Sequence, residues 1–195
     1  MEPLIQDILQ RNNGQITSQD LRDVALNPRI LFSLAQRGEL ERIDRGVYID
    51  PAVFEDDMSI LQYRFSRGVY FKDTALFLHH MLDRTPERYQ MNFPAGYHAT
   101  RITAYPVDVF TQKPDLYELG IEEVMTPGQH LVRVYNVERT LCDILRTRDQ
   151  SDSETIRQAM REYARMKQRN IGRLIEYANL FNVRSRIDNY LEVLL

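Results

Sequence analysis

The spacing of hydrophobic residues predicts three short helices and a hairpin at the start of this 195-residue chain. Apolar residues recur at helical spacing over residues 3–11, 17–25 and 27–37, so each stretch has one face for a core and one for solvent. Residues 40–44 and 47–49 then predict two short strands around a tight turn at Gly46. Three helices followed by a hairpin form a winged helix-turn-helix.

Residues that begin and end helices support these bounds. Asn27 is an N-cap residue, and Pro28 after it loses only an N–H that has no partner inside a helix. Thr17 and Asp20 have the spacing of a capping box, although Asp is shorter than the Glu or Gln that the box prefers. Gly38 can adopt the left-handed conformation that ends a helix. The predicted inward-facing residues are Leu4, Ile5, Ile8, Leu9, Leu21, Val24, Ala25, Leu31, Leu34 and Ala35.

The outward face of the third helix is the candidate binding surface, and it carries Arg29, Phe32, Ser33, Gln36 and Arg37. The second helix of a helix-turn-helix lies in the major groove of DNA, and a wing can reach phosphate or the minor groove. The candidate DNA-binding residues are therefore Arg29, Ser33, Gln36 and Arg37 on the helix, with Arg42 and Arg45 on the wing. Arg29, near the helix N-terminus, is the best candidate for reading a base. A small helical domain that binds protein is the alternative.

The rest of the chain predicts a sheet followed by helices. A helix at 58–66 precedes a strand end at 69–71 and a helix capped by Asp73; strands follow at 89–93, 107–111, 121–126 and 130–135, and helices at 137–147, 153–167, 170–181 and 183–194. Acidic residues 55–57 mark a boundary between a winged domain, 1–56, and a second domain, 57–195. The predicted fold class is α+β: a winged helix-turn-helix, then a mixed α/β domain with a helical C-terminal part.

Composition predicts a globular protein of the cytoplasm. Apolar residues make up 43% and charged residues 27%, which argues against disorder. No apolar run approaches the ~20 residues of a membrane span, and the N-terminus lacks the basic and apolar regions of a signal peptide. The lone cysteine, Cys142, excludes an internal disulfide and a cysteine-based zinc site, and its apolar neighbours predict a core position.

The net charge of −3 is unusual for a DNA-binding protein until it is divided along the chain. Residues 1–45 carry 6 basic and 7 acidic side chains, residues 46–138 carry 8 and 13, and residues 139–195 carry 11 and 8. The acidic excess therefore lies mostly in the middle. Of the basic residues, 22 are Arg, whose planar guanidinium suits bidentate contacts to phosphate or guanine.

A second basic surface is predicted on a C-terminal helix, where Arg157, Arg161 and Arg165 recur at every fourth position. Glu154 and Glu162 each precede an arginine by three residues, which favours a solvated helix face with local ion pairs. The alternative is a surface that tracks phosphates or binds a partner.

The competing hypothesis is an enzyme in the second domain, such as a nuclease or a nucleotidyltransferase. No lysine has an acid two positions before it, so the Asp/Glu-x-Lys arrangement of restriction-type nucleases is missing. Glycine-rich phosphate loops and a Gly-x-Ser-x-Gly motif are missing as well. His79 and His80, adjacent on a predicted helix, point about 100° apart and are unsuited to sharing a metal. We predict no catalytic residue, no metal and no cofactor.

Several stretches resemble the AbiEi family, the antitoxins of type IV toxin-antitoxin systems that act in abortive infection. LAQRG at 34–38 and LERIDRGVY at 40–48 are similar to the N-terminal domain of that family. GVYFKDTALFLHH at 68–80 with Pro94 beyond it, NVERTLCD at 136–143 and the helical tail from Arg173 resemble its C-terminal antitoxin domain. The similarity therefore spans nearly the whole chain.

This resemblance implies a repressor of its own operon that also counteracts a nucleotidyltransferase-like toxin. The DNA partner would be an inverted repeat in the promoter, bound by monomers that pair on the double strand, and the C-terminal domain would neutralise the toxin. Neutralisation in type IV systems need not involve a stable toxin-antitoxin complex, so none is predicted. The alternative is a plain winged-helix transcription factor without a toxin partner.

Overall fold

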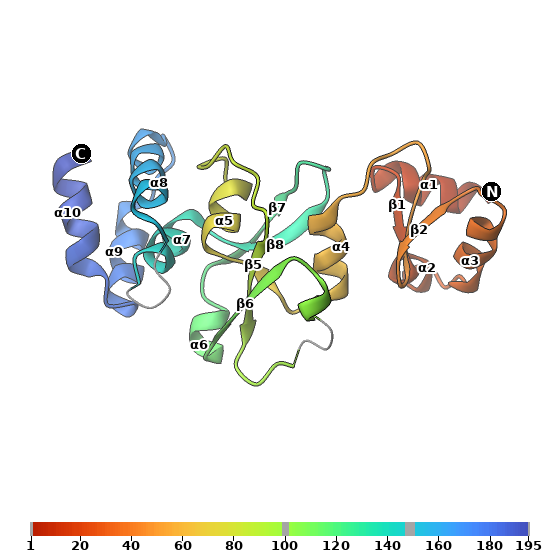
Figure 1. Cartoon of the computed structure of the whole chain (residues 1–195), viewed down its shortest axis with the longest axis horizontal. Helices are drawn as coiled ribbons and strands as arrows, with labels where there is room; N and C mark the ends of the chain where they lie inside the picture. Colours follow the sequence, from red (N-terminus) through yellow and green to blue (C-terminus); the bar gives the residue numbers. More distant parts are fainter. Residues whose placement is uncertain (1, 99–101, 147–150, 195) are drawn as a thin grey trace. The chain divides into compact units, whose positions relative to one another are not determined.

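The computed structural model describes residues 2–98, 102–146 and 151–194. Helices and mixed sheets make up the fold, so the predicted α+β class is confirmed (Figure 1). The chain forms two compact units, the first from Met1–Arg64 with Met125–Leu131 and the second from Phe65–Val124 with Val132–Leu195. The domain boundary after residue 56 stays a prediction, and the first compact unit includes one helix beyond it.

The first unit has the elements of a winged helix-turn-helix. Its helices are α1 (Pro3–Arg11), α2 (Ser18–Asp23), α3 (Arg29–Gln36) and α4 (Asp57–Arg64), and its strands are β1 (Gln15–Thr17), β2 (Glu41–Asp44) and β3 (Val47–Ile49). β3 is the middle strand and pairs antiparallel with both β1 and β2. The sequence pattern does not predict β1, because 3 residues are too few to show an alternation. The predicted hairpin of β2 and β3 is confirmed.

Local capping interactions fix the two helices of the motif. α3 begins at Arg29 with Pro28 as its N-cap, one residue later than predicted, and the Oδ1 atom of Asn27 still accepts the backbone N–H of Arg29 at 3.0 Å. The capping box of Thr17 and Asp20 is complete despite the shorter acid, with the Thr17 N–H donating to Asp20 Oδ2 at 2.6 Å. Gly38 has a φ of +73° and ends α3 as predicted. The residues that the sequence predicts at the ends of these helices therefore make end-specific contacts or adopt end-specific conformations in the structure.

Three residues predicted to face inward are exposed instead. Leu4 and Val24 are 42% and 39% exposed, and Ala25 is also exposed. The reason at α2 is an early helix end: Ala25 has a φ of +58°, and the N–H of Leu26 donates to the carbonyl of Leu21 at 2.8 Å. This left-handed turn removes Val24 and Ala25 from the helical face, while Leu26 packs against the core.

Asp56 holds together segments of the first unit that are distant in sequence. Its Oδ1 atom accepts the backbone N–H groups of Met58 and Ser59 at 3.1 and 3.3 Å, which caps α4. Its Oδ2 atom accepts the hydroxyl of Thr126 and lies 2.7 Å from Nδ1 of His130. A buried carboxylate thereby attaches the segment Met125–Leu131 to the start of α4.

His130 is placed to carry a positive charge. Its Nδ1 faces the Asp56 carboxylate and its Nε2 lies 3.0 Å from the carbonyl oxygen of Asn12, so the imidazolium form can donate at both nitrogens. The hydrogen bond with Asp56 raises the pKa of His130. Burial alone would raise the pKa of Asp56, but hydrogen bonds from His130 and Thr126 outweigh it and lower that pKa.

The second unit is built on a mixed sheet, where the sequence predicts a mixed or an antiparallel one. Its strands β4 (Val69–Tyr70), β5 (Tyr89–Pro94), β6 (Val107–Gln112), β7 (Ile121–Met125) and β8 (Leu131–Tyr135) lie in the order β6-β5-β4-β8-β7. β4 pairs antiparallel with β5 and parallel with β8, and β5 pairs parallel with β6. The predicted cap by Asp73 is wrong, because α5 (Lys72–Leu78) begins after Phe71 and the Asp73 carboxylate accepts the Ser151 hydroxyl at 2.5 Å instead.

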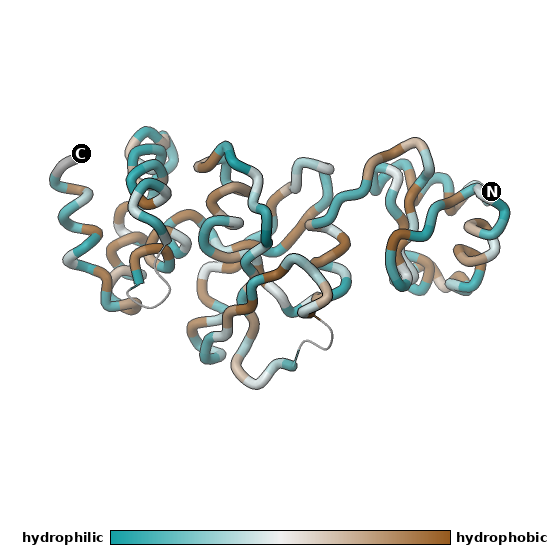
Figure 2. Tube along the Cα trace, viewed as in Figure 1, coloured by the Kyte–Doolittle hydropathy of each residue, from teal (hydrophilic) through white to brown (hydrophobic). Residues whose placement is uncertain are grey.

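Helices make up the C-terminal part, as predicted, together with short helices beside the sheet. The further elements are η1 (Ile102–Ala104), α6 (Pro114–Tyr117), α7 (Val137–Ile144), α8 (Ser153–Arg165), α9 (Ile171–Leu180) and α10 (Arg184–Leu194). One core joins α5 with α7, α8, α9 and α10, and Cys142 is buried in it as predicted. α8 shows hydrophilic colour over much of its length (Figure 2), while its buried residues include Ile156 and Tyr163.

A fully buried ion pair lies in the second unit. The Nε atom of Arg139 donates to Asp143 Oδ2 at 2.6 Å, and both side chains are 0% exposed. The guanidinium lies between the rings of Tyr135 and Phe181, whose centroids are 4.2 and 4.3 Å from its central carbon. It also donates to the side-chain oxygen of Gln112. Arg139 thereby connects the sheet, α7 and the segment after α9.

Candidate nucleic-acid interface

α3 presents the polar face that the sequence predicts. Leu31 and Leu34 are 0% and 1% exposed and fix the helix against the core. The residues exposed on α3 and just after it are Arg29, Phe32, Ser33, Gln36 and Arg37. The structure thus brings all four predicted helix contacts to solvent. Phe32 lies among them with 49% of its surface exposed, although the pattern that placed it there gave it no role.

Few internal contacts occupy the polar groups of this face. The Nε atom of Arg37 pairs with Glu39 Oε1 at 2.8 Å, and this exposed pair contributes little stability. The Ser33 hydroxyl lies 3.5 Å from the carbonyl of Arg29, which is a long hydrogen bond. Within the described ranges, the side chains of Arg29 and Gln36 make no ion pair or hydrogen bond, and the contacts of Arg29 are those of its backbone. Both side chains can reach a ligand without breaking a contact.

The wing carries the other two predicted residues, and both are exposed. The Nε atom of Arg42 donates to the carbonyl of Asp44 at 3.3 Å. The Asp44 carboxylate accepts the backbone N–H of Arg45 at 2.6 Å and pairs with Nη1 of Arg64 on α4 at 3.3 Å. Because Arg64 compensates the carboxylate nearest the turn, the arginines of the wing keep a surplus of positive charge.

These side chains supply the donors that nucleic acids accept. An arginine can bind guanine O6 and N7 with two parallel hydrogen bonds, and a glutamine can bind adenine in the same manner. Any exposed guanidinium can bind a phosphate. The arrangement therefore has groups for both base and backbone contacts, and the six residues remain predictions as DNA contacts.

Comparison with known families bears on the same domain. Residues 3–49 match the family described as transcriptional regulator, AbiEi antitoxin. The resemblance to AbiEi is confirmed over this segment. It contains α1, α2, α3 and both strands of the wing, so the exposed face of α3 lies inside the AbiEi match. The matched family is one of regulators, which supports a regulatory role for the chain.

A solved structure resembles more of the chain than this segment. The crystal structure of the RV2827C protein from Mycobacterium tuberculosis aligns with a TM-score of 0.56 over 90% of this chain and 70% of that one. The sequences are 16% identical, so this likeness concerns the fold alone. A comparison with curated proteins gave no match.

The predicted second basic surface lies on α8 with its arginines largely paired. Arg157 pairs with Glu154 at 2.5 Å and Arg165 pairs with Glu162 at 2.9 Å, as the spacing of three residues favours. Arg161, between them, is exposed. The geometry is that of a solvated helix face with local ion pairs, and a binding role for these arginines stays untested.

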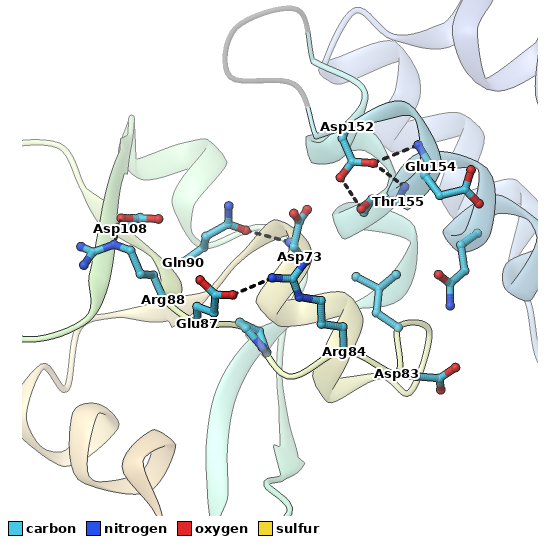
Figure 3. A pocket seen from close by; sticks show the side chains of 13 residues that line it. Asp73, Asp83, Arg84, Glu87, Arg88, Gln90, Asp108, Asp152, Glu154 and Thr155 are labelled. Carbon is cyan, nitrogen blue, oxygen red and sulfur yellow. Dashed lines mark hydrogen bonds and ion pairs between the residues drawn. The ribbon is translucent and has the colours of Figure 1, made fainter.

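A cavity of about 760 Å³ lies in the second unit, and six of the 13 residues that line it are acidic (Figure 3). The fold already uses most of these carboxylates. Asp73 accepts the Ser151 hydroxyl, Asp108 pairs with Arg88 at 2.7 Å, and Asp152 caps α8 through the backbone N–H groups of its first turn. We therefore assign no catalytic role to this cavity.

The described chain lacks two further features. Within 2–98, 102–146 and 151–194, no group of three or more His, Cys, Asp or Glu side chains is placed to hold a metal ion. No helix of the described chain has the length and apolar character to cross a bilayer. The predicted helical position of the two adjacent histidines is wrong, because α5 ends at Leu78 and His80 has a φ of +57°. The side chain of His79 is 8% exposed, with Nε2 2.8 Å from the Tyr135 carbonyl oxygen, and His80 is exposed.

Proposed function

We propose that this protein is a repressor of the AbiEi antitoxin type that binds the promoter of its own operon through α3 and the wing. The observation that carries the proposal is the exposed, arginine-bearing face of α3 inside the segment that matches AbiEi regulators. Promoter binding places the protein in the cytoplasm.

In the proposed docking, α3 reads bases and the wing contacts phosphate or the minor groove. Arg29, at the first turn of α3, enters the major groove and reads a base, supported by Ser33 and Gln36 on the next turn. Arg42 and Arg45 contact phosphate or the minor groove beside it. One winged domain covers one half-site, so two monomers pair on an inverted repeat.

The first prediction separates base reading from backbone attraction. Arg29→Ala should weaken binding to the operator by about 1–3 kcal/mol and blur the preference among operator variants. Arg45→Ala should weaken all sequences alike and reduce the salt dependence by about one phosphate contact. Mobility shifts over a salt series, with the promoter DNA and single-base variants of it, measure both effects.

Arg11→Ala is the matched control, because Arg11 lies on α1 and pairs with Asp7 at 2.7 Å, outside α3 and the wing. This variant should bind like the wild type. The wild-type chain should give two successive shifted species on an inverted repeat. Unchanged base preference in Arg29→Ala would remove Arg29 from the groove. A single species that saturates on a half-site, with no gain in affinity from the full repeat, would contradict paired binding.

We also propose that the second domain counteracts a nucleotidyltransferase-like toxin, for which a stable complex between the two proteins is not required. The resemblance of residues 68–80 and 136–143 to the AbiEi antitoxin domain supports this activity, which needs neither an enzyme site nor a cofactor in this chain. The alternative is a plain transcription factor. Such a protein would not rescue cells that express the toxin, whereas an antitoxin would.

The second prediction is that antitoxic activity persists without operator binding. A full-length Arg29→Ala/Arg42→Ala/Arg45→Ala chain should lose repression, because it lacks three groove and backbone contacts. It should still rescue cells in which an unrelated promoter drives the cognate toxin, as judged by colony counts. The wild-type chain is the positive control. Loss of rescue in a variant that is still folded would place antitoxic activity in the winged domain.

A further inference from the structure

We infer that Phe32 reads the 5-methyl group of a thymine in the operator half-site, an inference that rests on the proposed DNA binding. Phe32 is 49% exposed at the middle of α3. Arg29 and Gln36 lie one helical turn before and after it, so the ring shares their face. An aromatic ring at the centre of a polar surface offers a contact that hydrogen-bond donors cannot supply.

The fold does not use the exposed part of this ring. The partly buried apolar residues that pack against the core of the first unit are Leu26, Ile30 and Ala35. Leu31 and Leu34 turn fully inward. Phe32 belongs to neither group, so its outer edge is left to a partner and a smaller residue at this position should leave the fold intact.

The partner that fits is a methyl group in the major groove. Thymine is the base that presents an apolar group there, its C5-methyl, and phenylalanine is among the residues that contact it. Side chains three or four positions apart on a helix have Cβ atoms about 5–6 Å apart. Base pairs rise about 3.4 Å, so the thymine should lie one or two base pairs from the base that Arg29 reads.

The flanking charge favours DNA over an apolar protein surface as the occupant of this face. Arg29 has no acidic side-chain partner within the described ranges. Covering it with an apolar interface would bury an uncompensated guanidinium, whereas phosphates and base acceptors compensate it. Phe32 thus becomes part of the specificity of the surface, beside the polar residues.

The test removes only the methyl group. Each thymine of the operator is replaced in turn by deoxyuridine, and binding of the full chain is measured by fluorescence anisotropy. Loss of one buried methyl corresponds to about fourfold weaker binding per half-site, expected at one thymine position and not at the others. Phe32→Ala should weaken binding to the thymine operator and be insensitive to uridine at that position, while Phe32→Leu should retain part of the discrimination.

Leu4→Ala is the matched control, because Leu4 is an apolar residue with a similar exposed fraction, 42%, on α1. This variant should respond to uridine like the wild type. Equal uridine sensitivity of the wild type and Phe32→Ala would overturn the inference, as would equal weakening of all sequences. A changed sedimentation mass of free Phe32→Ala with unchanged uridine sensitivity would place the ring in a protein interface. A wild-type chain without any sequence preference would instead overturn the proposed function itself.

Discussion

Replacing Arg139 with methionine is expected to destabilise the second unit by about 3–5 kcal/mol, because the buried carboxylate of Asp143 loses its main partner. The change also frees the carbonyl oxygens of Leu116 and Leu119, which now accept Nη1 at 2.6 and 2.8 Å. Urea titration followed by circular dichroism measures the loss. Hydrogen exchange of peptides from α7 and β6 assigns it to this unit.

Two companion variants make the result specific. Arg157→Met removes an exposed ion pair with Glu154, three residues away on the same helix, and should leave the unfolding midpoint unchanged. Arg139→Met combined with Asp143→Leu removes both charges and should be less destabilised than Arg139→Met alone, because no unpaired carboxylate remains. Wild-type stability of Arg139→Met would contradict the role assigned to the buried pair.

The sequence alone could not reveal that pair. Arg139 and Asp143 have the spacing of an ordinary surface ion pair on a helix. All eight residues of α7 are buried, because the sheet and later helices surround it. Phe181, which stacks on the guanidinium, lies far along the chain. Contacts of this kind depend on the tertiary arrangement, so they cannot be predicted from residue spacing or composition.

Residues that begin and end helices are easier to predict from the sequence, provided that their residue type favours that role. Asn27 and Gly38 act within a few residues of their own position, and their roles follow from side-chain chemistry and backbone freedom. Ala25 adopts a left-handed conformation without such a signal, since alanine does not favour it. The helical spacing therefore predicts, wrongly, that Val24 and Ala25 are buried.

In the candidate site, too, the sequence predicts what depends on local spacing and does not predict tertiary contacts. The helical period sufficed to place Arg29, Ser33 and Gln36 on one exposed face. The pairing of Asp44 with Arg64 joins the wing to a helix beyond the predicted domain boundary, and local pattern cannot supply it. The charge that the wing presents to a ligand therefore depends on tertiary contacts.

Replacing Asp56 with alanine is expected to destabilise the first unit by about 2–4 kcal/mol. The carboxylate caps α4, and it is the acceptor for Thr126 and His130. A lost helix cap costs about 1 kcal/mol, and hydrogen bonds to a charged group contribute about 1.5–3 kcal/mol. Hydrogen exchange should rise in peptides covering α4 and Thr126–His130. Asp57→Ala, next to Asp56 and without its contacts to Thr126 and His130, is the matched control.

The same contact should make the first unit depend on pH. Because its pKa is raised above the ordinary 6.5, His130 stabilises the fold fully below that value and loses this contribution as pH rises through the folded pKa. The pKa of Asp56 is lowered below 3.8, so its contribution is present above that value and lost as pH falls through the folded pKa. Protection of Thr126–His130 against exchange should therefore be greatest between about pH 4 and 6.5 and decline above.

Two variants test whether this decline belongs to the contact. His130→Gln can donate a hydrogen bond but has no titrating ring, so it should remove the decline above neutral pH while keeping partial protection. Gly128→Ala should expose the segment at every pH, because a Cβ at Gly128 would lie 2.5 Å from Asp56 Oδ2. A decline of equal size in His130→Gln would assign the pH dependence to another group. Absence of the decline in His130→Gln would assign the pH dependence of the wild type to the contact between protonated His130 and Asp56.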